Sequence, residues 1–225
     1  MKKHFTLIEL LIIVAIIAIL ISLLLPALTN AKNVTKRSLC LSNHNQTSTA
    51  AFLYLKNNSY KFPDVNINHK DASFGGRSWF GKKGRGDWLL TITQRPMNKY
   101  LGLTEDGIEP YALICPFNDL TFDDVYTKVG TSYIGNSITQ WESLSSKFLP
   151  EVTKPSTTVM ISEFGSLAYA RQYNHPDVNF WRMVHHIGVP RYPFARIDGS
   201  ALHAKILPFE GINFESEKVN MKINF

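Results

Sequence analysis

The side chains best suited to metal chemistry lie near the C-terminus of the sequence. His185, His186, Asp198 and His203 offer imidazole and carboxylate groups, which are ligands for transition metals. In an extended chain, however, the adjacent His185 and His186 point to opposite faces. Asp198 and the following Gly199 form a typical turn pair. We therefore favour structural hydrogen bonding by His186 over a metal or catalytic site.

Known catalytic motifs give no support for an enzyme. The sequence contains no nucleophile elbow, no phosphate-binding glycine loop and no dinucleotide-binding fingerprint. The expectation is a protein without catalytic activity and without an obligatory cofactor.

Two cysteines, Cys40 and Cys115, are the only thiols of the chain. Neither has the spacing of a metal site or a CxxC partner. In an oxidising compartment an even pair can form one disulfide. The alternative is two buried free thiols, and the sequence leaves both interpretations open.

The net charge of +6 comes from basic residues scattered along the chain. The densest group is Lys82, Lys83 and Arg85, in a glycine-rich stretch. A nucleic-acid surface normally shows a basic stripe interleaved with aromatic residues. We therefore interpret the charge as a solvated surface and expect no nucleic-acid partner.

An apolar run extends from Phe5 to Leu25, and Glu9 is the one carboxylate within it. The run is apolar on every side, which favours a helix surrounded by lipid or by other apolar helices. As a helix it would be about 31 Å long, close to the thickness of a hydrocarbon core. A cleavable secretory signal is usually shorter, and a plain membrane anchor would not explain Glu9.

The carboxylate of Glu9 needs a partner or water. Placing it within a bilayer costs about 2.5–3.5 kcal/mol at the centre and less near an end. If the chain were cut before Phe5, the new α-ammonium group could pair with Glu9 of a neighbouring copy. The alternative is that Glu9 is hydrated among the lipid headgroups.

The segment KKHFTLIELLIIVAIIAIL resembles the N-terminal signal of type IV pilins and of type II secretion pseudopilins. The resemblance implies a leader, Met1 to His4, that a prepilin peptidase removes. The same enzyme would methylate Phe5, and Glu9 would act in filament assembly. Pro26 matches the proline that bends the long helix of this family, and a kink is also expected physically. The family usually has glycine before the cut, where this chain has His4.

The resemblance also implies a location and partners. The protein would cross the inner membrane once, with its N-terminus in the cytoplasm and its globular domain in the periplasm or on a surface filament. Its partners would be the prepilin peptidase and methyltransferase, other pilin-like subunits in a homo- or hetero-filament, and membrane lipids.

The sequence predicts an α+β fold. A long kinked N-terminal helix over residues 5–57, transmembrane over 5–25, would pack on a mainly antiparallel β-sheet in a globular domain over 58–225. Within this domain we expect the following elements. They are a surface loop over 60–86, a helix over 88–101 in which Pro96 starts a second short helix, strands over 125–138 and 157–161, a hairpin over 192–207 with both Asp198 and Gly199 at positive φ, and a final strand over 211–225.

A second resemblance rests on CLSNHNQ, CPFND and HHIGVPRYPFARIDGSALH. These blocks are similar to a bacterial family of prepilin-like proteins with a C-terminal H-x9-DG motif. The motif would be His186, Asp198 and Gly199, although here eleven residues separate the histidine from the aspartate. This resemblance supports the architecture more than an activity.

Two ligand interpretations remain open beside a structural role. Type II pseudopilins can hold Ca²⁺ in an acidic loop, and Asp119, Asp123 and Asp124 lie in an acidic stretch. Aromatic side chains could also form a sugar-binding face, although such residues are more often core. These residues are Trp79, Phe80, Trp88, Trp141, Tyr169, Tyr173 and Trp181.

The function expected from the sequence is a structural pilin or pseudopilin subunit, assembled into a filament of a type II secretion system or a type IV pilus. The alternative is a membrane-anchored module that binds a polysaccharide outside the cytoplasm. A metal-dependent enzyme is the third hypothesis.

Overall fold

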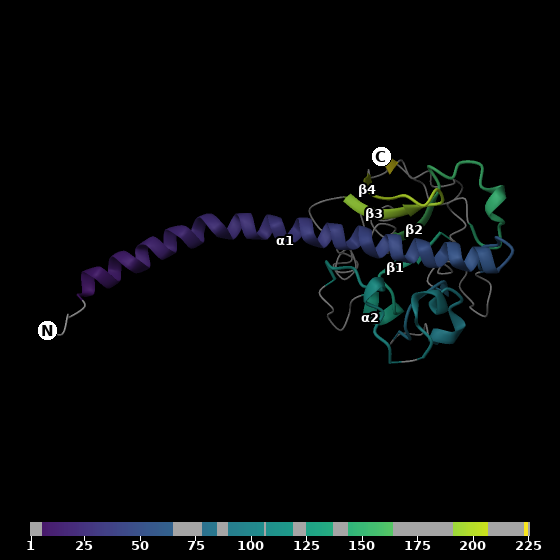
Figure 1. Cartoon of the computed structure of the whole chain (residues 1–225), viewed down its shortest axis with the longest axis horizontal. Coiled ribbons are helices and arrows are strands. Elements are labelled where there is room, and N and C mark those ends of the chain that lie inside the picture. The colour runs from purple at the N-terminus through teal and green to yellow at the C-terminus, as the bar shows by residue number, and fades with distance from the viewer. Residues whose placement is uncertain are drawn as a thin grey trace, which may run out of the picture. The chain divides into compact units, whose positions relative to one another are not determined.

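A computed structural model of the chain describes residues 6–64, 78–84, 90–105, 107–118, 125–136, 144–163, 191–206 and 223–224 (Figure 1). The chain divides into two compact units, Met1–Ser38 and Leu39–Phe225. A long helix and an antiparallel sheet give the α+β class that the sequence predicts.

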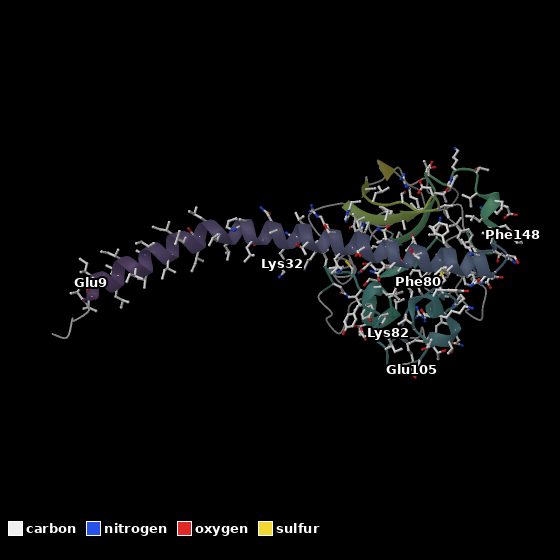
Figure 2. The ribbon with its side chains drawn as sticks, in the orientation of Figure 1. Glu9, Lys32, Phe80, Lys82, Glu105 and Phe148 are labelled. Atoms are coloured by element: carbon white, nitrogen blue, oxygen red, sulfur yellow. The ribbon has the colours of Figure 1, made fainter. Side chains whose placement is uncertain are left out.

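Helix α1 runs over Leu7–Asn57 and ends where the sequence predicted. Its part in the first unit carries apolar side chains in all directions, and Leu7, for example, is 89% exposed. Pro26 lies inside the helix, where its ring removes one backbone hydrogen bond. The helix curves between the labelled residues Glu9 and Lys32 (Figure 2).

The sheet of the second unit has five antiparallel strands in the order of the sequence, β1-β2-β3-β4-β5. The strands are β1 (Tyr133–Gly135), β2 (Val159–Glu163), β3 (Arg191–Arg196), β4 (Ala201–Ile206) and β5 (Ile223–Asn224). The predicted final strand is confirmed only at these two residues, because the rest of 211–225 lies outside the described part.

The second unit also contains short helical turns. They are η2 (Ile92–Gln94), η3 (Asn98–Leu101), η4 (Tyr111–Leu113), α2 (Val125–Val129) and η5 (Leu149–Glu151). The predicted strand over 125–138 is therefore wrong at its start. Gly130, with φ of 88°, ends α2 by donating its N–H to the carbonyl of Tyr126 at 2.7 Å, and only then does the chain extend into β1.

The second half of α1 packs into the core of the globular unit. Buried residues recur at helical spacing over Cys40, Asn43, His44, Thr47, Ser48, Ala51 and Leu55. Cys40, Ala51 and Leu55 belong to the same hydrophobic cluster as Tyr133 of β1 and Ile161 of β2. The helix thus shares one core with the sheet, and four residues of its buried face are polar.

The predicted surface loop over 60–86 is wrong for its described parts. Phe62, Trp79 and Phe80 are fully buried, and the rings of Phe62 and Trp79 stack with centroids 5.8 Å apart. Gly-, Asn- and Lys-rich flanks suggested exposure, but the three aromatic side chains bury a large apolar area. That apolar burial outweighs the polarity of their neighbours.

Arg95 holds the backbone around these aromatic residues. Its guanidinium is 2% exposed and donates to the carbonyls of Phe80 and Val129, both at 2.7 Å. Desolvation lowers the pKa of Arg95 to about 10. The charge stays on the side chain at neutral pH, because even this lowered pKa lies well above 7.

Gly135 of β1 provides a test of the core. A methyl group on this residue would overlap the indole ring of Trp79. We expect Gly135→Ala to reduce the free energy of unfolding by about 1–3 kcal/mol through overpacking, measured by urea denaturation. Gly102→Asn is the control. Its position has open space and a left-handed backbone that asparagine tolerates, so stability should stay near wild type. Equal stability of Gly135→Ala and wild type would contradict this packing.

Candidate functional site

Between Thr6 and Ala31 the first unit offers an extended apolar surface with a single charge. From Thr6 to Ala31 the helix contains no ionisable residue except Glu9. Every side chain from Thr6 to Asn30 is exposed. Among the described residues, α1 is the one helix long and apolar enough to cross a membrane. The chain therefore has a segment that could serve as a single-pass membrane anchor.

Thr6 and Glu9 form a capping box at the start of α1. The backbone N–H and the hydroxyl of Thr6 donate to Oε2 of Glu9, at 2.8 and 2.9 Å. In return, the N–H of Glu9 donates to Oγ1 of Thr6 at 3.3 Å. The spacing T-x-x-E at residues 6–9 is the signal that could have revealed this cap in the sequence.

The cap satisfies only part of the Glu9 carboxylate. Both hydrogen bonds from Thr6 end on Oε2, and within the described residues Oε1 has no donor. Both donor groups are also neutral, so the negative charge has no counter-charge from the described part of the chain. A cationic group from elsewhere would meet an oriented carboxylate with one oxygen available.

The buried face of α1 in the second unit carries a polar cluster. Nδ2 of Asn43 donates to the carbonyl of Ile114 at 3.0 Å and to the hydroxyl of Tyr133 at 3.3 Å. The ring of His44 meets that of Tyr133 edge-on, with centroids 4.6 Å apart. Thr47 donates its hydroxyl back to the carbonyls of Asn43 and His44. Hydrogen bonds thus compensate the burial of much of this face.

The two cysteines meet inside this cluster. Sγ of Cys40 lies 3.9 Å from Sγ of Cys115, and both residues are fully buried. Glu163 of β2 is buried beside them and pairs in register with Tyr133 of β1. The sequence named Cys40 and Cys115 as one pair, and the structure brings the two side chains together.

The surroundings of the cysteines favour the protonated thiol. Burial raises the pKa of Cys115 well above its ordinary value, and the hydrogen bond with Cys40 and the charge of Glu163 raise it further. Burial likewise raises the pKa of the Tyr133 phenol, again with help from the neighbouring cysteines and Glu163. Thiolate, the reactive form of cysteine, is therefore suppressed in the folded protein.

This raised pKa predicts that the reduced protein loses stability in alkali. Above the ordinary thiol pKa of 9.0, the unfolded chain releases the Cys115 proton while the folded chain retains it. The free energy of unfolding should then fall by up to about 1.4 kcal/mol per pH unit. Urea denaturation in the presence of a reductant, from about pH 8 to about pH 10.5, measures this slope.

Cys115→Ser is the control for the alkaline loss, because a serine hydroxyl does not titrate in this range. The fall in the free energy of unfolding per pH unit should be smaller in the variant than in the wild type, by the contribution of the one Cys115 proton. The phenol of Tyr133 still contributes in both proteins above its ordinary pKa of 10.0. Identical slopes would contradict a protonated Cys115 in the fold.

A second polar site lies around Lys82. Its ammonium contacts both carboxylate oxygens of Glu109 at 2.9 Å and stands 4.4 Å above the ring of Tyr126. Tyr126 donates its hydroxyl to Glu109 as well. Lys82 and Glu109 line an open cavity of about 530 Å³, together with Lys83. Lys82, part of the densest basic group in the sequence, is thus held in an ion pair.

The predicted hairpin exists, but its turn differs from the prediction. Beyond the pair Ala195 and Ala201, the N–H of Arg196 donates to the carbonyl of Ser200 at 2.9 Å, which leaves residues 197–199 as the loop. Gly199 has φ of 87°, whereas Asp198 is not at positive φ. This is a three-residue loop with glycine in the left-handed position, not a two-residue turn.

Asp198 acts in this turn as a hydrogen-bond acceptor. Its Oδ1 accepts from the N–H and the hydroxyl of Ser200, at 2.9 and 2.6 Å. The hydroxyl bond of Ser200 is the main cause that lowers the pKa of Asp198. The favoured structural interpretation of the DG pair is therefore consistent with these contacts.

Several predicted site residues lie outside the described part of the chain. These are His4, Phe5, Arg85, Asp119, Asp123, Asp124, His185 and His186. In the part that the structure describes, no group of three His, Cys, Asp or Glu side chains could hold a metal ion.

The predicted sugar-binding face loses two members. Trp79 and Phe80 are fully buried in the core, so neither can stack on a sugar in this structure. Trp88, Trp141, Tyr169, Tyr173 and Trp181 lie outside the described residues.

Comparison of the chain with protein-family models, with curated proteins and with solved structures gives no match.

Proposed function

We propose that this protein is a filament subunit of the type IV pilin and pseudopilin class. In this proposal the first half of α1 anchors the chain in the inner membrane and then packs against the same segment of other subunits. The globular unit stays outside the cytoplasm. A prepilin peptidase removes Met1 to His4 and methylates Phe5.

The observation that carries the proposal is Glu9, the lone carboxylate in the first part of α1, which over residues 6–31 has no other ionisable residue and is predominantly apolar on all sides. Residues that merely anchor a protein in lipid need no charge, and a charge within the apolar segment is costly. The capping box orients the carboxylate but supplies no positive charge. The α-ammonium of a cleaved neighbour, staggered along the helix axis, supplies it.

The apolar side chains around Glu9 complete the surface for assembly. Leu7, Ile8, Leu10, Leu11 and Val14 line a shallow apolar groove beside it. When helices pack side by side, such a groove excludes water from the ion pair. The lower local dielectric then strengthens the attraction between carboxylate and ammonium.

Two substitutions separate the effect of the Glu9 charge from the effect of the capping box that Thr6 and Glu9 form. Glu9→Gln retains an oxygen that accepts the Thr6 hydrogen bonds, but it has no charge. Thr6→Ala weakens the cap by about 0.5–2 kcal/mol and keeps the carboxylate. We expect Glu9→Gln to insert into the membrane and to be absent from sheared filaments, while Thr6→Ala still assembles. Immunoblots of membrane and filament fractions measure both results.

The opposite pattern would mean that Glu9 serves only its own helix. In that case Glu9→Gln would assemble like wild type and Thr6→Ala would not. Wild-type protein found only as single copies in the membrane would likewise overturn the filament proposal.

The second expectation concerns processing. Mass spectrometry of the protein extracted from its native membrane should show a chain that begins at Phe5 and carries one additional methyl group. His4 stands where the family usually has glycine, so His4→Gly should be processed at least as completely as wild type. Protein that still carries Met1 to His4 would contradict the proposed pathway.

A further inference from the structure

Two cysteines that are distant in the sequence face each other where α1 enters the globular core. Cys40 and Cys115 are 75 positions apart in the chain, yet their sulfur atoms lie 3.9 Å from each other. Cys40 is the first fully buried residue of α1. Cys115 follows η4, in a segment that crosses this face of the helix.

The backbone around the pair is held from both sides. The carbonyl of Ile114, which precedes Cys115, accepts from Asn43, one turn beyond Cys40. The carbonyl of Leu113 accepts from the N–H of Ser132 at 2.9 Å, and that of Cys115 accepts from Asn118 at 2.8 Å. The two sulfur atoms therefore need only a short approach to reach bonding distance.

We propose that Cys40 and Cys115 are the site of a disulfide bond in the mature protein, which fastens α1 to the globular unit at the point where the helix becomes buried. This inference rests on the proposed function for its location outside the cytoplasm, where disulfides form and persist. The oxidant is a disulfide of an extracytoplasmic thiol oxidoreductase.

The bond forms in two thiol–disulfide exchange steps. The thiolate of one cysteine attacks a sulfur of the oxidant disulfide and gives a mixed disulfide, while one oxidant thiolate leaves. The second cysteine thiolate then attacks the protein sulfur of that mixed disulfide and releases the other oxidant thiolate. Two electrons pass to the oxidant, and the two protons of the cysteine thiols end on the oxidant thiols.

The timing of the bond follows from burial. Neither cysteine has exposed surface in the folded protein, and the environment of Cys115 disfavours thiolate. Attack on an external disulfide requires both access and thiolate. The bond therefore closes while the chain folds, before the core excludes the oxidant, and afterwards the same burial protects it from reductants.

One mass spectrum tests the bond and the location separately. The full chain is extracted from its native membrane into denaturant that contains an alkylating reagent, with and without prior reduction. We expect no alkyl group without reduction and two after it, and proteolysis should release a linked pair of peptides that contain Cys40 and Cys115. Two alkyl groups without reduction would overturn the disulfide.

The N-terminus in the same spectrum reports the proposed function. A chain that begins at methylated Phe5 but is alkylated at both cysteines without reduction would contradict only the disulfide. A chain that contains the disulfide but retains Met1 to His4 would support the disulfide and contradict the proposed pilin pathway.

Stability provides a second readout that does not depend on the membrane extract. In detergent, the purified full chain should melt roughly 5–15 °C higher when oxidised than when reduced. The variant C40A/C115A is the matched control, and its melting temperature should not respond to reductant. Because burial shields the bond in the folded protein, the protein is reduced in denaturant and refolded before it is melted. A wild type that melts at the same temperature before and after this treatment would overturn a stabilising bond.

The order of events has its own test. Reduced, folded protein exposed to oxidised glutathione should form the bond at least about tenfold more slowly than the same protein in urea, because only the unfolded thiols are accessible. Equal rates in the two conditions would overturn closure during folding.

Discussion

The structure depends on how one helix changes its surroundings along its length. Over residues 7–30 α1 is predominantly apolar with one carboxylate, Glu9, and every one of these residues is exposed in the described structure. Over its second part the same helix is buried, and its buried face includes Asn43, His44, Thr47 and Ser48. Buried polar groups need hydrogen-bond partners, and Asn43 finds them outside the helix in the carbonyl of Ile114 and the hydroxyl of Tyr133. The docking of the helix is therefore specific. These hydrogen bonds form in only one position of the helix, whereas a purely apolar stripe could pack in several positions.

The same contacts bring the ionisable groups together. Asn43 binds the backbone next to Cys115, and Tyr133 carries Glu163 as its neighbour in the sheet. Burial then shifts the pKa values of Cys115 and Tyr133 toward their protonated forms. In the folded state Cys115 and Tyr133 therefore stay protonated, and a protonated thiol is a poor nucleophile.

Sequence patterns predicted the long helix and its end at Asn57, because apolar composition and stop signals are local properties. The hairpin was predicted for the same reason, from Asp198 and Gly199. The type of turn was not, since the choice between two and three loop residues depends on the pairing register of Ala195 with Ala201. The burial of Trp79 and Phe80 was also missed. Their polar flanks dominate the local pattern, and the partner Gly135 is distant in the sequence.

The candidate site likewise combines features that have a local sequence signal with features that depend on long-range packing. Glu9 and the cysteine pair were recognised from residue type alone, but the capping box and the role of Glu163 were not. A carboxylate in β2 has no local signal for its contact with Cys115, because the contact depends on how β2 pairs with β1. Residues whose importance comes from long-range packing are invisible to spacing rules.

The polar face of α1 also affects the newly made chain. Translation delivers this helix before the residues around Leu113, Tyr133 and Ile161 that share its core. An apolar docking stripe would be prone to self-association during that interval. The polar side chains of Asn43, His44, Thr47 and Ser48 can be hydrated by water until then. In the proposed membrane-anchored protein, the distribution of polarity along one helix therefore separates membrane insertion of its first part from folding of its second part.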